Sequence, residues 1–209
     1  LTQADIEAVL DIANYNAIEV DAAALSQRLL KQFDILEDAR VSISLPNQVN
    51  VSVTERTPAF VWQTENETRW TDTKGFLFTP SGEPVQLLTI VSPDQPPLYK
   101  SPQEIKAIQE AEAALNKVKD EGQNATSYEA ALSALELARD PEGPRQIDPL
   151  LFDAAQKLAA NLPEGTQLAY SAANGLGWQD AGGWDVYIGV DLSDFDHKIA
   201  LYQSIIEQL

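Results

Sequence analysis

Acidic side chains dominate the chemistry that this sequence could perform, because 32 Asp and Glu stand against 14 Lys and Arg. A pair of carboxylates is what glycoside hydrolysis and much general acid–base catalysis require. Glu55 could form such a pair with Asp72, Asp180 or Asp185. No spacing forces any two of these residues together, and chance pairs are abundant among 32 acids. The sequence therefore favours no catalytic residue.

A cluster of metal-ligand types lies near the C-terminal end, in the stretch DLSDFDH at residues 191–197. It lacks the glycine at position six and the distal Glu that a calcium loop requires. His197 is the one histidine of the chain and cysteine is absent, so no multi-His or thiolate site can be built. We interpret Ser193 and Asp196 as a capping box of the last helix. We expect no metal and no other cofactor.

The overall charge narrows the classes of partner. A net charge of -18 repels phosphate backbones and anionic lipid headgroups, so we expect no nucleic-acid binding. No apolar run approaches the roughly 20 residues that span a bilayer, and no signal peptide is recognisable. The sequence begins at Leu1 and contains no methionine, which we interpret as a trimmed or processed chain.

The first 56 residues predict two helices followed by a β-hairpin. Thr2 and Asp21 are capping residues, and each stands before an amphipathic pattern of helical period. Apolar and polar residues then alternate over residues 41–45 and 49–53, with Pro46-Asn47 between them as a turn. This is a small α+β unit with one buried sheet face.

The remainder predicts short strands interrupted by helices. Strands are expected at 60–63, 68–71, 76–79, 167–171, 176–179 and 184–190. An Ala- and Glu-rich segment at about 102–139 predicts two helices separated by Gly122, and further helices begin at Asp148-Pro149 and near Phe195. The fold class is therefore α+β: a helix-helix-hairpin module, then a mostly antiparallel β domain with packed helices and a helical insertion.

Three stretches carry a resemblance to a known family. VNVSVTERTPAFVW at residues 49–62 resembles the strand that crosses between two domains in the FtsQ/DivIB family of bitopic bacterial cell-division proteins. RWTDTKGFLF at 69–78 is similar to the hairpin of that family, and GWDVYIG at 183–189, followed by Lys198-Ile199 and Leu201, is similar to its ending. The match in order and spacing covers residues 18–80 and 183–206. The helices at 102–139 are a longer insertion than the family usually carries.

The resemblance implies a domain organisation. A POTRA-like domain would occupy residues 1–56, and a β domain with the helical insertion would occupy 57–209. Glu55, Arg56 and Pro58 would form the joint, because a proline biases the residue before it towards an extended conformation. The POTRA domain of the family begins with a strand and its β domain continues past the last helix, whereas this sequence begins on a helix and ends at Leu209.

The resemblance also implies a function. It implies a non-enzymatic divisome scaffold in septum formation, single-pass in the cell membrane through an N-terminal anchor outside this sequence, with this part on the extracytoplasmic side. Its partners would be FtsB/FtsL-like division proteins and other envelope division proteins. Pairing of a partner strand with a sheet edge is the expected mechanism. The residues expected to bind the partner are Trp184, Val186, Ile188 and Tyr202.

The residues themselves are compatible with two other functions. A POTRA-bearing envelope assembly or secretion factor predicts several such units before a barrel, and one unit is recognisable here. An envelope hydrolase with a carboxylate pair predicts that Asp→Asn changes at Asp72, Asp180 and Asp185 abolish turnover. The scaffold hypothesis predicts instead that the protein dimerises or binds a β-peptide through residues 184–190, and that Val186→Lys prevents this.

Overall fold

The chain begins with two helices followed by a two-stranded hairpin. The computed structural model describes residues 1–11, 21–44, 48–82, 87–122, 124–141, 143–162 and 166–206. Helix α1 (Gln3–Leu10) starts at Thr2 with both bonds of the predicted capping box, and α2 (Ala22–Gln32) starts at Asp21, whose carboxylate accepts two backbone N–H groups. Strands β1 (Leu36–Ser44) and β2 (Gln48–Glu55) pair antiparallel. The predicted turn at Pro46-Asn47 lies outside the described residues.

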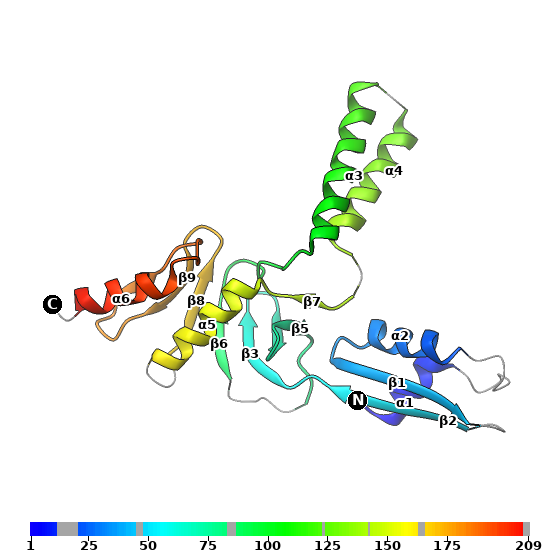
Figure 1. Cartoon of the computed structure of the whole chain (residues 1–209), viewed down its shortest axis with the longest axis horizontal. Helices are drawn as coiled ribbons and strands as arrows, with labels where there is room; N and C mark the ends of the chain where they lie inside the picture. The colour runs from blue at the N-terminus through cyan, green and yellow to red at the C-terminus, as the bar shows by residue number, and fades with distance from the viewer. Residues whose placement is uncertain are drawn as a thin grey trace. The chain divides into compact units, whose positions relative to one another are not determined.

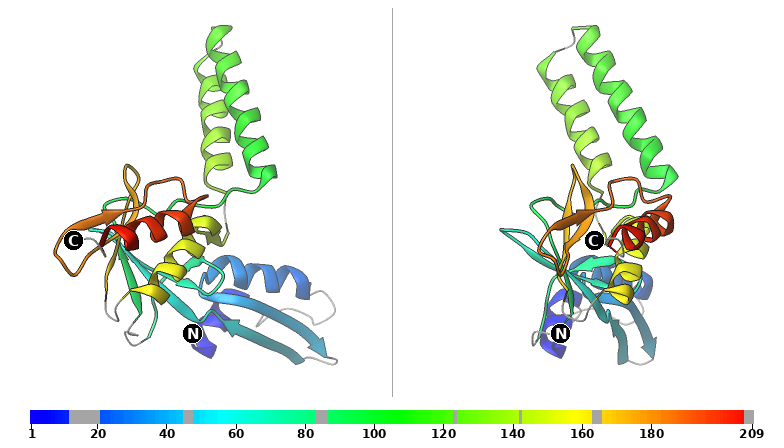
Figure 2. Two further views of the ribbon diagram at one scale, coloured as in Figure 1. Left: turned by 60° about the vertical axis from the view of Figure 1, so that its left-hand side comes forward. Right: turned by 90° about the vertical axis from the view of Figure 1, so that its left-hand side faces the viewer.

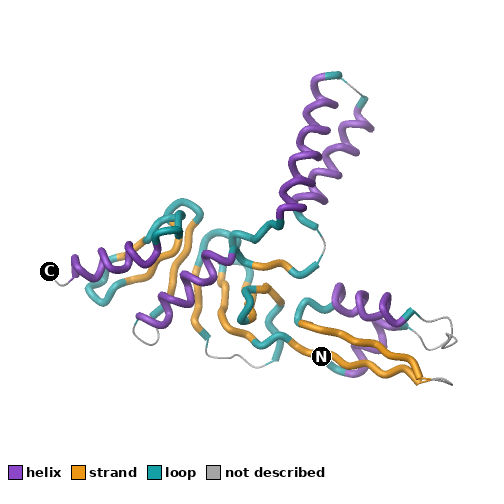
Figure 3. Tube along the Cα trace, in the orientation of Figure 1, coloured by secondary structure: helices purple, strands orange, loops and turns teal. Residues whose placement is uncertain are grey.

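A larger sheet follows along the chain (Figures 1 and 3), and it has eight strands. Its spatial order is β10-β9-β8-β6-β3-β4-β5-β7. Two of its pairs, β3 with β6 and β6 with β8, are parallel, and the others are antiparallel. The strands are β3 (Pro58–Gln63), β4 (Thr68–Asp72), β5 (Phe76–Phe78), β6 (Leu88–Val91), β7 (Arg145–Gln146), β8 (Leu168–Ser171), β9 (Gly175–Gln179) and β10 (Asp185–Tyr187). The mixture of helices and mostly antiparallel strands confirms the α+β class.

The crossover between the parallel strands β6 and β8 contains most of the remaining helices: α3 (Pro102–Asp120), α4 (Ala125–Arg139) and α5 (Pro149–Asn161). Helices α3 and α4 run side by side as a hairpin, with Leu115 and Leu135 buried (Figure 1). Residues Leu98–Gly143 form one compact unit, and Leu1–Pro97 with Pro144–Leu209 form the other. At the base of the insertion the Asp148 N–H donates to the Pro97 carbonyl at 2.8 Å.

One face of the sheet is covered by α5 and by α6 (Phe195–Ile206). The right-hand view in Figure 2 shows both helices on the same side of the strands. Cross-strand neighbours on this face form a continuous row, because residues opposite each other in a ladder share a face: Phe60, Trp62, Ile90, Leu168, Trp178 and Val186. These side chains pack with α5 residues such as Leu158, and with Phe195 of α6.

The opposite face of the sheet contacts the first two helices and their hairpin. Val61, Trp70 and Phe78 are cross-strand neighbours on this face. They share a second core with residues of α1, α2 and β1, among which Leu29 and Leu36 are fully buried. Successive side chains of a strand point to opposite faces of the sheet, so β3 supplies Phe60 and Trp62 to one core and Val61 to the other. The hairpin module and the sheet are therefore joined by a common core.

Candidate functional site

The first carboxylate candidate, Asp72, is a structural residue. Its Oδ2 lies 2.6 Å from Arg56 Nη1, and each of the two side chains is 5% exposed. Its Oδ1 accepts the backbone N–H groups of Lys74 at 2.8 Å and Phe76 at 2.9 Å, which fixes the turn between β4 and β5. Both oxygens are thus occupied by protein donors. This arrangement suits a buried anchor and leaves no oxygen facing a substrate.

The other three carboxylates lie in separate settings. Glu55 accepts a hydrogen bond from the N-terminal ammonium of Leu1 at 3.0 Å. Asp180, in the turn between β9 and β10, accepts a hydrogen bond from the Tyr202 hydroxyl of α6. Asp185 is exposed on β10. Each of the three has its own surroundings, so the structure gives no support to a particular catalytic pair.

The acidic stretch before α6 is organised by local hydrogen bonds. Asp191 Oδ1 accepts from the Ser193 N–H at 3.0 Å and the Ser193 hydroxyl at 2.7 Å, which lowers the pKa of the Asp191 carboxyl. The interpretation of Ser193 and Asp196 as a capping box was wrong, because α6 begins at Phe195 and the Ser193 N–H donates to Asp191 instead of Asp196. In the described ranges no group of three or more His, Cys, Asp or Glu side chains is placed to hold a metal ion.

Arg56 is the centre of the predicted joint. Besides Asp72, its Nε donates to the Asp34 carbonyl at 3.1 Å, and its guanidinium lies 4.7 Å from the centre of the Phe76 ring. Its own N–H donates to the Ile35 carbonyl at 2.8 Å. The arginine thus binds the segment before β1 and the β4–β5 turn at once. A planar fork of five donors is suited to such a multiple contact.

The remaining joint residues differ in burial. Glu55 is exposed at the end of β2, and Pro58 is half-buried at the start of β3, opposite Asp72 in the ladder. A proline has no N–H to donate to a neighbouring strand, and the first position of a strand tolerates this loss. Of the three residues expected at the joint, Arg56 is the one whose side chain is buried there.

Asp34 connects the end of α2 to the β4–β5 hairpin, and sequence reasoning missed it. Its carboxylate accepts from Arg69 Nη1 at 3.1 Å, and from the Thr79 N–H and hydroxyl at 3.0 and 2.7 Å. Asp34 follows α2, whereas Arg69 and Thr79 belong to the β4–β5 hairpin or follow it. The sequence offers only a weak signal for this role, namely a single acid directly after an amphipathic helix.

Strand β10 stands at one end of the strand order of the sheet in the described residues. Within the described chain β9 is its one ladder partner. The Asp180 N–H donates to the Trp184 carbonyl, and the Ile188 N–H to the Leu176 carbonyl, each at 2.9 Å. Hydrogen-bonded and non-hydrogen-bonded pairs alternate in an antiparallel ladder. The backbone groups of Asp185 and Tyr187 therefore point away from β9.

The four predicted partner-binding residues lie around this edge with different exposures. Trp184 is 47% exposed beside the turn, Val186 and Tyr202 are partly buried against the core, and Ile188 is 6% exposed. Tyr187, which the sequence reasoning did not select, is 43% exposed. Strand alternation explains the difference, since 186 and 188 face the core and 185 and 187 face away.

Tyr202 holds the edge hairpin to α6. Its ring makes an edge contact with Trp178 at 5.0 Å between centres, and its hydroxyl donates to Asp180. That bond lowers the pKa of Asp180, while burial, followed by the bond to the carboxylate, raises the pKa of Tyr202. The β9–β10 turn is thus fixed at its tip. A fixed strand loses less conformational entropy when another strand pairs with it.

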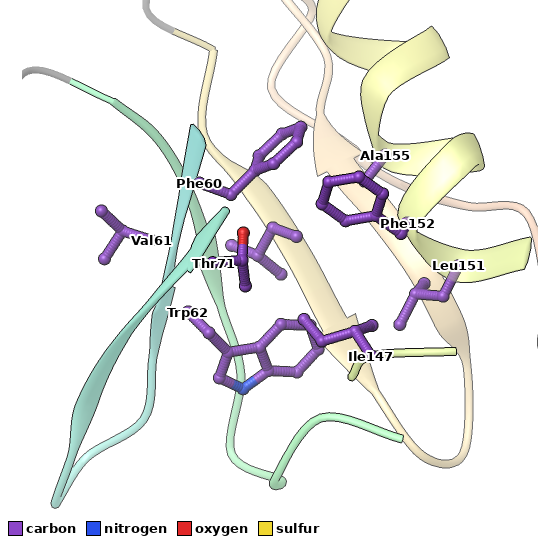
Figure 4. Close-up of a pocket in the computed structure, with 9 residues that line it drawn as sticks. Phe60, Val61, Trp62, Thr71, Ile147, Leu151, Phe152 and Ala155 are labelled. Atoms are coloured by element: carbon purple, nitrogen blue, oxygen red, sulfur yellow. The ribbon is translucent and has the colours of Figure 1, made fainter. Parts of the chain in front are cut away.

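A small cavity in the core is no ligand site. It measures ≈ 10 Å³ and lies between the sheet and α5, with Thr71, Phe60, Trp62 and Phe152 in its wall (Figure 4). The Thr71 hydroxyl is buried there without a hydrogen-bond partner.

No helix in the described part of the chain is long and apolar enough to span a bilayer.

Comparison with known proteins identifies the first module. Residues 1–56 match the model of the POTRA domain of the FtsQ type. A stretch of 79 residues is 39% identical to the cell division protein FtsQ of Zymomonas mobilis, and it covers 36% of this chain and 25% of that relative. Residues 1–56 are therefore similar to a POTRA domain of the FtsQ type, and together the two findings support an FtsQ/DivIB-type protein.

Proposed function

We propose that this protein acts in bacterial cell division as a non-enzymatic scaffold that binds division proteins through the open edge of β10. The family match of residues 1–56 and the similarity to the cell division protein FtsQ of Zymomonas mobilis support a role in division. The observation that carries the binding mechanism is the edge itself, with the backbone groups of Asp185 and Tyr187 facing away from β9. A partner strand would add to the sheet there.

The domain organisation belongs to the proposal. The POTRA domain would end at residue 56 and the β domain would occupy 57–209, with the α3–α4 hairpin as an insertion. Arg56 would fix the two domains to each other through its contacts with Asp72 and Asp34. A rigid joint suits a scaffold, because partners held by two domains keep a constant separation.

The partners and location follow from the same reasoning. FtsB/FtsL-like proteins, which pair a strand or coiled coil with the family's β domain, are the expected occupants of the edge. The protein would be held in the cell membrane by a single N-terminal anchor, with the described residues on the extracytoplasmic side. A catalytic role receives no support, because the carboxylate of Asp72, the most buried of the four candidate acids, forms an ion pair with Arg56.

Fluorescence localisation of the complete gene product in dividing cells tests the role in division. Enrichment at the septum, with filamentous cells after depletion, is the expected result. Even labelling of the envelope with normal septation would refute it.

A pair of variants tests the edge in the same cells. Val186→Lys introduces a charge on β10 and is expected to abolish rescue of the depletion. Val190→Lys, at a residue 62% exposed outside the strand, is the matched control and should rescue. Circular dichroism of both purified variants verifies that each is folded. Full rescue by a folded Val186→Lys protein would contradict the proposed mechanism.

A further inference from the structure

We propose that the α3–α4 hairpin binds a helix of another protein along one face of α4. We call it the outer face, and it consists of Thr126, Ala130, Ser133 and Leu137. The partner helix would place large aliphatic side chains on this face and Lys or Arg side chains beside it. The hairpin belongs to a compact unit of its own, Leu98–Gly143, so the inference goes beyond the binding proposed at β10.

Helix α4 carries two stripes of residues at helical spacing. The first stripe packs on α3: Leu135 is buried, Ala131 and Ala138 are half-buried, and Lys119 of α3 lies 5.9 Å from the centre of the Tyr128 ring. The outer face is the second stripe, with spacings of four, three and four residues, and all its members are exposed. A helix with two such stripes is suited to lie between two other helices.

The hairpin has a small core of its own (Figure 1). In α3 and α4 the buried side chains are Leu115 and Leu135. Leu137, by contrast, is 63% exposed. Units of this size bury little apolar surface by themselves, and packing supplies most of the stability of a helix in a protein. A third helix that covered the outer face would therefore stabilise the hairpin.

The outer face is uncharged, although the chain has a net charge of -18. The charged side chains of α4 are Glu129, Glu136 and Arg139, and Arg139 donates to Glu112 of α3 at 2.7 Å. The small side chains of Ala130 and Ser133 leave room on the outer face. The distance between two packed helices depends on the side chains at their contact. Leu or Ile side chains of a partner can fill this room.

Two glutamates border the outer face on one side. Glu129 and Glu136 are seven residues apart, and each directly precedes a residue of the outer face. In the heptad notation for paired helices, the outer face occupies positions a and d, and both glutamates occupy position g, where charged residues select the partner. Both are exposed, and no ion pair among the described residues involves either one. Lys or Arg side chains of the partner would complement them.

The same pattern disfavours a second copy of this chain as the occupant. In an antiparallel pair of α4 helices the g positions would meet, which brings Glu129 and Glu136 of one copy against those of the other. In a parallel pair the g positions would meet the e positions, which are Ser127 and Ala134. Neither orientation supplies a cation. The occupant that fits is therefore a helix of a different, more basic protein.

Titration of the 209-residue protein with synthetic helices, followed by NMR amide shifts at about 0.15 M ionic strength, tests the inference. The first probe is an acetylated and amidated peptide of about 21 residues that repeats Lys-Ile-Ala-Ala-Leu-Lys-Glu, so that Ile and Leu form the apolar stripe and Lys borders it. The second probe repeats Glu-Ile-Ala-Ala-Leu-Glu-Lys. The third has the composition of the first in an order that forms no apolar stripe.

The Lys peptide is expected to shift the amides of Ala130, Ser133 and Leu137, whereas the other two peptides should not. Leu137→Lys should weaken binding of the Lys peptide by about tenfold or more, because it places a charge in the contact. The matched control is Leu150→Lys on α5, since Leu150 is 62% exposed and the change in charge is the same. This control should leave binding unchanged.

A second pair of variants tests the charge at the border. Glu136→Lys should weaken the Lys peptide by about fivefold and allow the Glu peptide to bind, because an attraction is replaced by a repulsion. Glu65→Lys makes the same change in net charge at an exposed residue after β3, outside the hairpin, and should leave the preference unchanged.

Four results would overturn the inference. Equal binding of the Lys and Glu peptides would show that the two glutamates select no partner, and equal binding of the peptide without a stripe would mean adhesion to an acidic surface. A dimer of the protein that Leu137→Lys abolishes would make a second copy the occupant. Absence of binding at about 1 mM Lys peptide would leave the outer face without the proposed partner. Septal localisation and the β10 variants are measured independently, so the proposed function can stand or fall separately.

Discussion

Replacing Arg56 with Met should destabilise the protein more than loss of any exposed ion pair. The substitution leaves the Asp72 carboxylate buried without its cation, with only the N–H groups of Lys74 and Phe76 as donors. Two unit charges about 4 Å apart attract by about 4 kcal/mol at an effective dielectric constant of about 20. Breaking a buried pair from one side typically costs about 3–5 kcal/mol. We expect a loss of that size.

The structure offers a matched control for this measurement. Lys74 Nζ lies 2.6 Å from Glu37 Oε1, the same separation as the Arg56–Asp72 pair, but the two side chains are 63% and 38% exposed. Solvent screens such a pair, so Lys74→Met should leave the free energy of unfolding nearly unchanged. The two pairs have equal length, so they differ in burial and in the further contacts of Arg56 with the Asp34 carbonyl and the Phe76 ring.

Urea unfolding followed by tryptophan fluorescence and circular dichroism gives the free energies. Trp70 is 8% exposed and belongs to the core beside the joint, so its emission reports the region that is changed. The double variant Arg56→Met with Asp72→Asn should lose less than the sum of the single changes, because each single change leaves one buried charge unpaired and the double variant leaves none. An Arg56→Met protein as stable as Lys74→Met would refute the reasoning.

Three further changes have expected outcomes. Thr71→Val should stabilise the protein by about 1 kcal/mol in urea unfolding, because it removes a buried hydroxyl without a partner; a destabilised variant would contradict this. Gly175→Ala should lower the thermal midpoint much more than Gly183→Ala does. Both glycines have positive φ, but at 175 the new Cβ would lie 2.0 Å from a backbone carbonyl oxygen. Equal midpoints of the two variants would disprove the clash. Tyr202→Phe should lower the midpoint most near neutral pH. The pKa of Asp180 is lowered, so the stabilisation by the hydrogen bond is lost as the pH falls below about 4 and the carboxylate is protonated. The pKa of Tyr202 is raised, so the stabilisation is also lost as the pH rises past about 10 and the hydroxyl ionises. A difference in midpoint between Tyr202→Phe and the parent protein that stays constant from pH 2 to 11 would exclude the bond.

Local chemistry made part of the fold predictable from sequence. The Thr2 capping box and the Asp21 cap were recognisable because a capping side chain bonds to backbone groups two or three residues away. The hairpin of β1 and β2 follows from period-two alternation on either side of a turn. The start of α6 was misread in detail, because Asp191 and Asp196 are both within reach of the one Ser193 N–H and sequence spacing does not decide between them.

Pairing between distant segments was not predictable in the same way. Arg56 was assigned to a joint, but its partner Asp72 is one of 32 acids, and only the folded chain selects it. The alternation around Trp70 and Phe78 shows that one face of these strands is covered but not by which elements, and the structure shows that α1, α2 and β1 cover it. The outward register of Tyr187 depends on the pairing of β9 with β10, so the candidate list from sequence omitted it.

The bond between the Asp148 N–H and the Pro97 carbonyl has a consequence for the order in which the chain folds. Pairing of β6 with β8 must close a long loop, which costs entropy before any contact forms. A helical hairpin assembles from local contacts, so α3 and α4 can form early and bring their flanking segments together. Sequence changes within the hairpin would then alter the rate of sheet formation while leaving the finished sheet the same.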